Sequence, residues 1–180
     1  MRVIAGELKG RRLLAPRGWT VRPTGDRARE AIFSALADVS GTRVLDLFCG
    51  TGALAIEALS RGAAEAVLVD RDLRPALGNV ESLGLRERAE LVRSDVERWL
   101  EGWRDSAERT PFDLVFVDAP YRLADRVGLA LDTHLPRLLA DGGRAIVESP
   151  ARRPLRIESL QRLRQRRYGA ADVSFYGTAE

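Results

Sequence analysis

Two short stretches of the sequence hold residue types that could carry out a reaction. They are Asp46-Leu-Phe-Cys-Gly-Thr-Gly52 and Asp118-Ala-Pro-Tyr121. The first joins a carboxylate to two glycines, which permit a tight turn and let a ligand lie close to the backbone. The second joins a carboxylate to a stiff proline turn and an aromatic ring. The pair is typical of a cofactor loop followed by a site that acts on an amino nitrogen.

Two aspartates favour S-adenosylmethionine as the cofactor. Asp70 ends the second predicted strand, 24 residues after Asp46, where a carboxylate can accept hydrogen bonds from both ribose hydroxyls of a nucleoside. Asp46 stands four residues before the first glycine, where it could pair with a methionyl ammonium but would repel a phosphate.

The glycine loop alone leaves another cofactor open, because Gly50-x-Gly52-x-x-Ala55 also satisfies the dinucleotide fingerprint of a dehydrogenase. A dehydrogenase is disfavoured, since no remaining segment is large enough for a separate substrate domain. Asp95, after the third predicted strand, could accept the adenine amino group or could cap the following helix.

The second stretch suits an amine acceptor. An amino group on a nucleic-acid base is a poor nucleophile, because its lone pair is delocalised into the ring. Asp118 and a following backbone carbonyl can hold its two hydrogens while the nitrogen attacks. Tyr121 offers a ring on which a flipped base can stack. On these residues alone, an ordinary turn at a strand end remains the alternative.

The elements that must position both stretches alternate between strand and helix from residue 43 onward. Strands are predicted at Arg43–Leu47, Ala66–Asp70, Ala89–Arg93, Phe112–Asp118 and Arg144–Glu148. Helices are predicted near 53–61, 73–83, 95–104 and 124–139. The strand centres are continuously apolar, as in strands buried on both faces. This alternation predicts an α/β fold with a mainly parallel, doubly wound sheet, closed by an antiparallel hairpin of residues 164–168 and 173–176.

The first 40 residues form an extension to that pattern. Arg2–Ala5 and Arg11–Ala15 read as a short hairpin, and a helix follows with Thr24 as its N-cap. This piece is too small to fold alone. We therefore expect one domain over residues 1–180, with 1–40 packed on a catalytic core of 41–180.

Composition excludes several classes of protein. Hydrophobic residues make up 45% and charged residues 31% of 180, which argues against disorder. No apolar run approaches the length of a membrane span, and the first residues lack a secretory signal, so a cytoplasmic protein is expected. One cysteine, Cys49, fits a reducing compartment. The single histidine, His134, is expected to be a surface or capping residue rather than a catalyst, and no Cys/His set suggests a metal site.

Charge is unevenly distributed along the chain. Residues 2–29 carry a net charge of +6 and residues 151–180 a net charge of +4, whereas the segment between them carries −7. Basic patches beside a catalytic core suggest a polyanionic partner, most plausibly nucleic acid. The alternative is a solvated surface in an arginine-rich protein, since Lys9 is the only lysine.

Three segments resemble the RsmD family of class I methyltransferases, and the resemblance spans the whole chain. They are Arg22-Pro-Thr-Gly-Asp-Arg-Ala-Arg-Glu30-Ala-Ile-Phe33, Asp46-x-Phe-x-Gly-x-Gly-Ala-Leu54 and Glu57-Ala-Leu-Ser-Arg-Gly-Ala63. The resemblance implies a Rossmann-like fold, S-adenosylmethionine as cofactor with S-adenosylhomocysteine as product, and no metal. It further implies methylation of a guanine N2 in 16S ribosomal RNA, as naked RNA or in the small ribosomal subunit.

The resemblance also implies roles for individual residues. Those expected to bind the cofactor are Asp46, Phe48, Gly50, Gly52, Asp70, Asp95 and Val96. Those expected to engage the guanine are Asp118, Ala119, Pro120 and Tyr121. Arg22, Thr24 and Arg27 are expected near the substrate entrance, although a helix cap and surface charge explain them almost as well. Ala119 departs from the family pattern, which has proline there; the backbone carbonyl is retained.

Two other functions remain open at this stage. A DNA adenine-N6 methyltransferase shares the second motif, but no segment is left for the groove-entering structure that duplex readout needs. A non-catalytic RNA- or nucleoside-binding module could use the same fold. The intact Asp118 argues against such a module.

Overall fold

The computed structural model describes residues 1–15, 24–104, 110–120 and 124–178. Its helices are α1 (Thr24–Leu36), α2 (Ala53–Ser60), α3 (Arg74–Ser82), α4 (Val96–Arg104) and α5 (Ala124–Leu138). Its strands are β1 (Arg43–Leu47), β2 (Glu65–Asp70), β3 (Ala89–Arg93), β4 (Phe112–Asp118), β5 (Leu139–Pro150), β6 (Gln161–Tyr168) and β7 (Ala171–Gly177). Strands and helices alternate from β1 to β5, as the sequence predicts.

Within the described residues, the strands form one sheet in the order β3-β2-β1-β4-β5-β7-β6. The first five strands in this order run parallel, β7 runs antiparallel to β5, and β6 runs antiparallel to β7. The strand order reverses at β1, where the chain crosses from one half of the sheet to the other through β4. The predicted doubly wound sheet with an antiparallel C-terminal hairpin is therefore confirmed.

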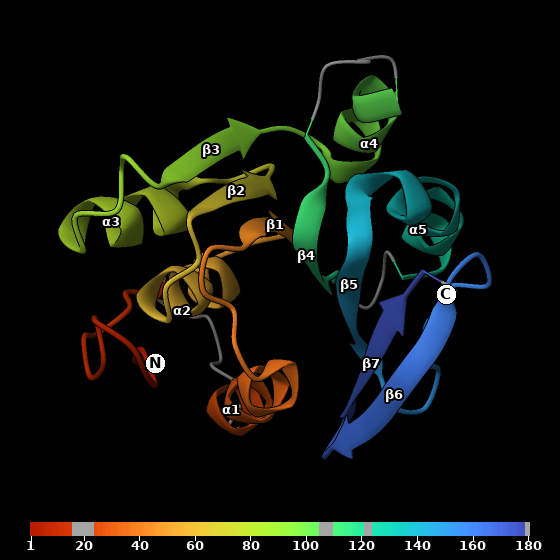
Figure 1. The fold of residues 1–180 in the computed structure, drawn as a ribbon, viewed down its shortest axis with the longest axis horizontal. Helices are drawn as coiled ribbons and strands as arrows, with labels where there is room; N and C mark the ends of the chain where they lie inside the picture. The colour runs from red at the N-terminus through yellow and green to blue at the C-terminus, as the bar shows by residue number, and fades with distance from the viewer. Residues whose placement is uncertain (16–23, 105–109, 121–123, 179–180) are drawn as a thin grey trace.

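Helices cover both faces of the sheet (Figure 1). Apolar residues of α1, α2 and α3 pack on one face, and those of α4 and α5 pack on the other. Alternate residues of β4 serve the two faces: Phe116 meets Phe33 of α1 at 5.6 Å between ring centroids, while Val117 joins the opposite cluster. Since side chains alternate along a strand, Asp118 projects on the same face as Phe116.

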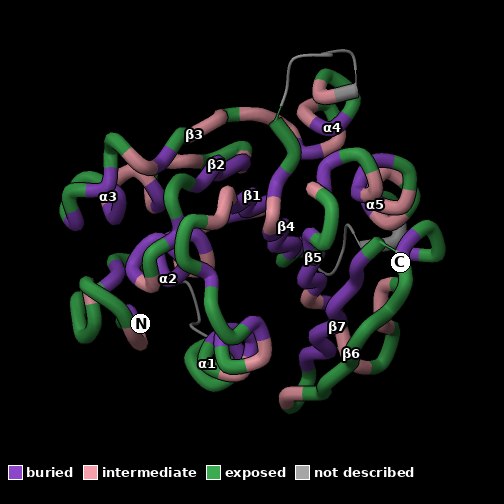
Figure 2. The backbone as a smooth tube through the Cα atoms, viewed as in Figure 1, coloured by how far each residue is buried: buried purple, intermediate pink, exposed green. Residues whose placement is uncertain are grey.

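The C-terminal hairpin has one buried strand and one exposed strand (Figure 2). Every residue of β7 is buried, because it lies between β5 and β6 with helices over its faces. Seven of the eight residues of β6 are exposed, since this strand forms an edge of the sheet. The charged residues of this edge, chiefly arginines, discourage edge-to-edge pairing with another chain.

The prediction for β5 was wrong at its start. The strand begins at Leu139, which pairs with Phe112, and the register shifts before Leu114 pairs with Arg144. Gly143 lies in this irregular segment, and a Cβ added there would come 2.8 Å from the carbonyl oxygen of Ala140. The close backbone approach therefore requires glycine.

The N-terminal hairpin is shorter than predicted. The chain reverses with one antiparallel bridge, between Arg2 and Arg12. A longer ladder does not form because the backbone N–H groups of Ile4 and Ala5 donate to the carboxylate of Glu57 in α2, at 2.7 and 3.0 Å. The Glu57 carboxylate thus satisfies the two N–H groups that the hairpin does not pair.

Two smaller expectations also need correction. Thr24 is the first residue of α1 rather than the cap before it. His134 lies on α5 with only 7% of its surface exposed, so it is not a surface residue. No described helix is long and apolar enough to cross a membrane.

Candidate active site at the carboxyl ends of β1, β2 and β4

The loop after β1 has an unusual backbone that β2 helps to fix. Phe48, Gly50 and Gly52 all have positive φ, at 61°, 54° and 74°. The backbone N–H groups of Phe48 and Cys49 donate to the carbonyl of Val69, at 3.0 and 3.3 Å. A left-handed conformation costs a non-glycine residue such as Phe48 about 1–2 kcal/mol. The surrounding contacts therefore hold the loop in a shape it would not adopt alone.

Gly52 is required for a reason the sequence did not reveal. It precedes α2, and a Cβ added to it would lie 2.9 Å from Leu68 Cδ2 and 3.5 Å from the Cβ of Ala76. A side chain at this position would therefore collide with protein atoms. Glycine at this position lets the start of α2 pack closely against β2 and α3.

Asp46 is the most deeply buried carboxylate in the candidate site. Its side chain is 1% exposed and accepts a hydrogen bond from the backbone N–H of Ala55, at 3.1 Å. Burial, together with the charges of Asp118 and Asp70, raises the pKa of Asp46 to about 7, although the hydrogen bond from Ala55 acts to lower it. A cationic group beside it would favour the ionised form. Asp46 therefore fits the ammonium of a methionine moiety.

Asp70 supports the same loop from the end of β2. Its Oδ2 accepts a hydrogen bond from the backbone N–H of Gly50, at 2.9 Å, and its Oδ1 accepts one from Asp72, at 3.1 Å. The side chain is only partly buried. Asp70 is therefore fixed in position by backbone donors while part of it remains accessible to a ligand.

Asp95 caps a helix, which was one of the two interpretations that the sequence left open. The backbone N–H of Arg98 donates to its Oδ1, at 3.2 Å, and α4 begins at the next residue, Val96. The Arg71 guanidinium also pairs with this carboxylate, through Nε at 2.7 Å. Burial acts to raise the pKa of Asp95, but these hydrogen bonds outweigh it and hold the pKa below its usual value. Val96 is buried.

The second motif lies beside the first. Asp118 ends β4, the strand next to β1, and its side chain is exposed. Asp46 is aligned with Phe116 in the register of β1 and β4, so Asp118 stands two residues beyond the partner of Asp46, on the same face of the sheet. Ala119 is buried and Pro120 is exposed. Tyr121 lies outside the described residues.

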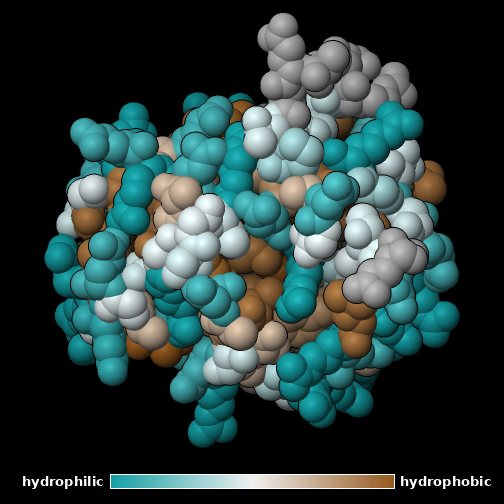
Figure 3. Space-filling model, in the orientation of Figure 1, coloured by the Kyte–Doolittle hydropathy of each residue, from teal (hydrophilic) through white to brown (hydrophobic). Residues whose placement is uncertain are grey.

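Figure 3 shows apolar side chains in a hollow near the middle of the view, between the places of α2 and β4 in Figure 1. Polar residues surround this hollow on several sides.

Of the residues expected at the substrate entrance, Arg22 lies outside the described residues, Thr24 begins α1, and Arg27 is exposed on α1.

Comparison with known proteins identifies the family of this chain. Residues 1–177 match the family described as Conserved hypothetical protein 95. The chain is 36% identical over 183 residues to YlbH of Bacillus subtilis, covering 98% of both proteins. It is 37% identical over 155 residues to ribosomal RNA small subunit methyltransferase D of Escherichia coli, covering 83% of this chain and 74% of that protein.

The chain belongs to the RsmD family of methyltransferases.

Solved structures agree with this membership. The Escherichia coli protein yhhF superposes with a TM-score of 0.81 at 32% identity, covering 100% of this chain and 99% of that one. An RNA methyltransferase of Salinibacter ruber, solved with S-adenosyl-L-homocysteine, gives a TM-score of 0.63 at 16% identity, over 88% of this chain and 95% of that one. The second likeness concerns the fold alone. The predicted Rossmann-like class I methyltransferase fold is confirmed.

Sequence reasoning missed two buried polar residues that support this RsmD-family site. Glu57, 1% exposed, holds Ile4 and Ala5 and pairs with Arg61 Nε at 2.8 Å. Arg29 of α1 also approaches it, at 3.7 Å from Nε to Oε2. A lone acidic residue in the otherwise apolar helix α2 is the signal that could have found it.

Asn79 is the second such residue, and its side chain is fully buried. Its amide nitrogen donates to the carbonyls of Leu14 and Thr51, at 3.0 and 2.9 Å, and its oxygen accepts from the N–H of Leu14, at 2.7 Å. Thr51 belongs to the glycine loop. Asn79 therefore ties the N-terminal segment to the loop that is expected to hold the cofactor.

Two further features concern the chemistry of this site. Burial raises the pKa of the Cys49 thiol, so this residue stays protonated and packs in the core rather than acting as a nucleophile. Among the described residues, no group of three or more His, Cys, Asp or Glu side chains could hold a metal ion.

Proposed function

We propose that this protein is a cytoplasmic ribosomal RNA methyltransferase that modifies the exocyclic N2 amine of a guanine in the 16S RNA. The observation that carries the proposal is the placement of exposed Asp118 next to buried Asp46, at the carboxyl edge of one sheet. Asp46 is suited to pair with a buried cation, and Asp118 is accessible to a substrate that arrives from solvent. The chain's similarity to ribosomal RNA small subunit methyltransferase D supports RNA as that substrate.

The residues of the loop fit S-adenosylmethionine. Asp46 would pair with the ammonium, Asp70 would accept the ribose hydroxyls, and Asp95 with Val96 would contact the adenine. Phe48, Gly50 and Gly52 shape the loop around the methionine moiety. When bound, the cofactor supplies a methyl group already activated by a positive sulfonium.

The second motif would act on the guanine. Asp118 accepts one hydrogen of the N2 amine, and the backbone carbonyl of Ala119 accepts the other. Pro120 stiffens the turn that carries both acceptors, and Tyr121 stacks on the flipped base. As the new nitrogen–carbon bond forms, Asp118 takes the amine proton. Because Asp118 is exposed, it can then release this proton to water.

We further propose that residues 1–180 work as one domain, with 1–40 placed against the core by Glu57 and Asn79. Arg22, Thr24 and Arg27 would then lie at the RNA entrance. In this arrangement the N-terminal segment would contact both the RNA and the loop that is proposed to hold the cofactor.

One assay tests the target. Purified protein is incubated with methyl-labelled S-adenosylmethionine and, separately, with 16S RNA, small ribosomal subunits or duplex DNA, and the products are digested to nucleosides. We expect label in N2-methylguanosine from one of the two RNA substrates. Label in N6-methyladenine from DNA would refute the proposal in favour of a DNA methyltransferase. Absence of label from all three substrates, in protein that binds the cofactor, would instead indicate a binding module.

A further inference from the structure

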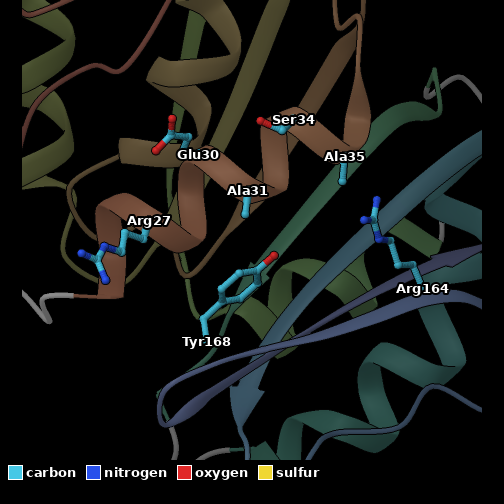
Figure 4. A pocket seen from close by; sticks show the side chains of 7 residues that line it. All are labelled: Arg27, Glu30, Ala31, Ser34, Ala35, Arg164 and Tyr168. Atoms are coloured by element: carbon cyan, nitrogen blue, oxygen red, sulfur yellow. The ribbon is translucent and has the colours of Figure 1, made fainter.

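A groove of about 380 Å³ separates α1 from the edge strand β6 (Figure 4). Arg27, Glu30 and Ser34 line it from α1, and Arg164 and Tyr168 line it from β6. In the close-up, the Tyr168 ring reaches from the strand toward the helix, with Arg27 and Arg164 on either side of it. The groove thus combines an aromatic ring with two guanidinium groups.

We infer that this groove binds a single-stranded segment of the RNA next to the target nucleotide. Arg27 and Arg164 would contact phosphates, and the ring of Tyr168 would stack on a base. The inference rests on the proposed function, because it assumes an RNA substrate, and it adds a second contact surface to the site at β4.

The register of the sheet places this groove near the candidate catalytic residue. Asp118 is aligned with Glu148 of β5, Glu148 with Val173 of β7, and Val173 with Arg166 of β6. Three strand spacings of about 4.8 Å separate the first from the last, or about 14 Å. An RNA strand that enters the Asp118 site could therefore continue into the groove.

The groove also lies on the face of the sheet from which Asp118 projects. Val173 packs in the same core cluster as Phe116 and α1. Arg166 is opposite Val173, and alternation puts Arg164 and Tyr168 on the same face. Asp118 projects on this face too. The candidate catalytic carboxylate and the groove side chains therefore share one side of the molecule.

Basic residues from the two ends of the sequence meet at this groove. Arg27, on one side of the groove, belongs to the first basic end of the sequence (residues 2–29), and β6, on the other side, belongs to the second (residues 151–180). Among the described residues, no ion pair neutralises Arg27, Arg164 or Arg166. Charges left without a partner are available to a polyanion. The one acidic lining residue, Glu30, is suited to accept hydrogen bonds from a base amino group.

The ring distinguishes RNA from an acidic peptide as the occupant. Aromatic side chains beside arginines are typical of single-strand sites, where each base stacks on a ring and the backbone follows the cations. An acidic peptide would use the arginines but would gain little from Tyr168. The contribution of the ring is therefore the decisive measurement.

The experiment measures binding of a fluorescent single-stranded RNA from the 16S sequence, by anisotropy at several salt concentrations. We expect the double variant Arg27→Gln with Arg164→Gln to bind at least tenfold more weakly, with a salt slope reduced by about 0.7 for each lost phosphate contact. Tyr168→Leu should weaken binding at least fivefold and leave the slope unchanged. Arg86→Gln is the matched control, because Arg86 is exposed and lies between α3 and β3, at the opposite end of the sheet.

Cofactor affinity, measured by calorimetry, should stay within twofold of wild type in every variant, which excludes general misfolding. RNA binding that is unchanged in Tyr168→Leu, or displacement of RNA by polyglutamate as readily as by polyuridine, would overturn the inference. The proposed function is tested separately by the nucleosides that the wild-type protein labels. If wild type forms N2-methylguanosine but the groove variants bind RNA normally, only the groove assignment fails.

Discussion

The two halves of the site differ in where their polar groups find partners. At the ends of β1 and β2, Asp46 and Asp70 are hydrogen-bonded by the backbone of Ala55 and Gly50. At the end of β4 and along β6, Asp118 and the arginines lie exposed to solvent. The half at β1 and β2 is held in place by the protein's own backbone. The half at β4 and β6 instead exposes a carboxylate and guanidinium groups to which an external partner can bind.

This difference predicts how the two halves respond to mutation. Changes in the preformed half alter the protein as well as its cofactor affinity, because the same carboxylates hold the loop. Changes in the exposed half alter transfer or RNA binding and leave the fold intact, because these side chains lie at the surface rather than in the core. Each prediction below tests this separation.

The largest effect is expected from Asp118→Ala. Loss of the acceptor for the amine proton should reduce methyl transfer about 10³-fold, while cofactor affinity stays within twofold. Single-turnover transfer and calorimetry measure the two quantities. Asp141→Ala is the control, since Asp141 is exposed near the opposite end of β5. If cofactor binding falls in parallel with transfer, the two halves are not separable.

Asn79→Ala should lower the free energy of unfolding by about 2–4 kcal/mol. The variant leaves the buried carbonyl of Thr51 and the part-buried N–H and carbonyl of Leu14 without their partner, and it empties a fully buried site. Urea denaturation measures the loss. Ser82→Ala on the same helix removes one hydrogen bond, to the carbonyl of Asn79, and should cost less than about 1 kcal/mol. A loss for Asn79→Ala no larger than that of the control would show that the N-terminal segment does not depend on this side chain.

Asp46 should make cofactor binding depend on pH. With a pKa of about 7 in the ligand-free protein, the carboxylate is ionised in roughly a tenth of molecules at pH 6 and in nine-tenths at pH 8. If only the ionised form pairs with the ammonium, affinity should rise about tenfold over this interval. Calorimetry at constant ionic strength measures it. In Asp46→Asn the rise should disappear, and a rise of the same size there would assign the pH dependence to another group.

The same residue should act on stability in the opposite direction. Because the folded pKa of Asp46 is raised, the folded state holds a proton that the unfolded state has released. Ligand-free protein should therefore lose stability as the pH rises from about 4 to about 7. Asp46→Asn should remove this contribution, so its melting temperature relative to wild type should increase between pH 5 and pH 8.

The smallest effect is expected from Ala119→Pro, which restores the residue usual in the family. Asp118 already lies at the end of a strand, and extended backbone is what a following proline requires. Stability should rise by about 0.4–1 kcal/mol through reduced freedom of the unfolded chain, with transfer within twofold of wild type. Thermal unfolding and steady-state transfer check both. A tenfold loss of transfer would mean that the turn depends on the conformational freedom of alanine.

Much of this fold was predictable because its strands are continuously apolar. Such runs identify buried strands directly, and the position of Asp46 and Asp118 at their ends follows from the topology. The start of β5 was missed because it depends on pairing with Phe112, which no local pattern reveals.

The supporting residues of the site were harder to find. Glu57 and Asn79 act on backbone groups more than 50 residues away, so only the folded chain shows their partners. His134 was misplaced for a similar reason, since its burial depends on what covers α5. The close packing of Gly52 against Leu68 was also hidden from the sequence, because Leu68 lies on the next strand, β2.

The bonds from Ile4 and Ala5 to Glu57, and from Leu14 to Asn79, also constrain the order in which the chain folds. These residues cannot dock until α2 and α3, which follow them in the chain, have been synthesised and have packed on β1 and β2. Contacts between residues so distant in sequence carry a large loop-closure cost, so they form late. Residues 1–15 thus precede α2 and α3 in the chain but pack after them, and they contact the loop after β1 only once the sheet beneath it has formed.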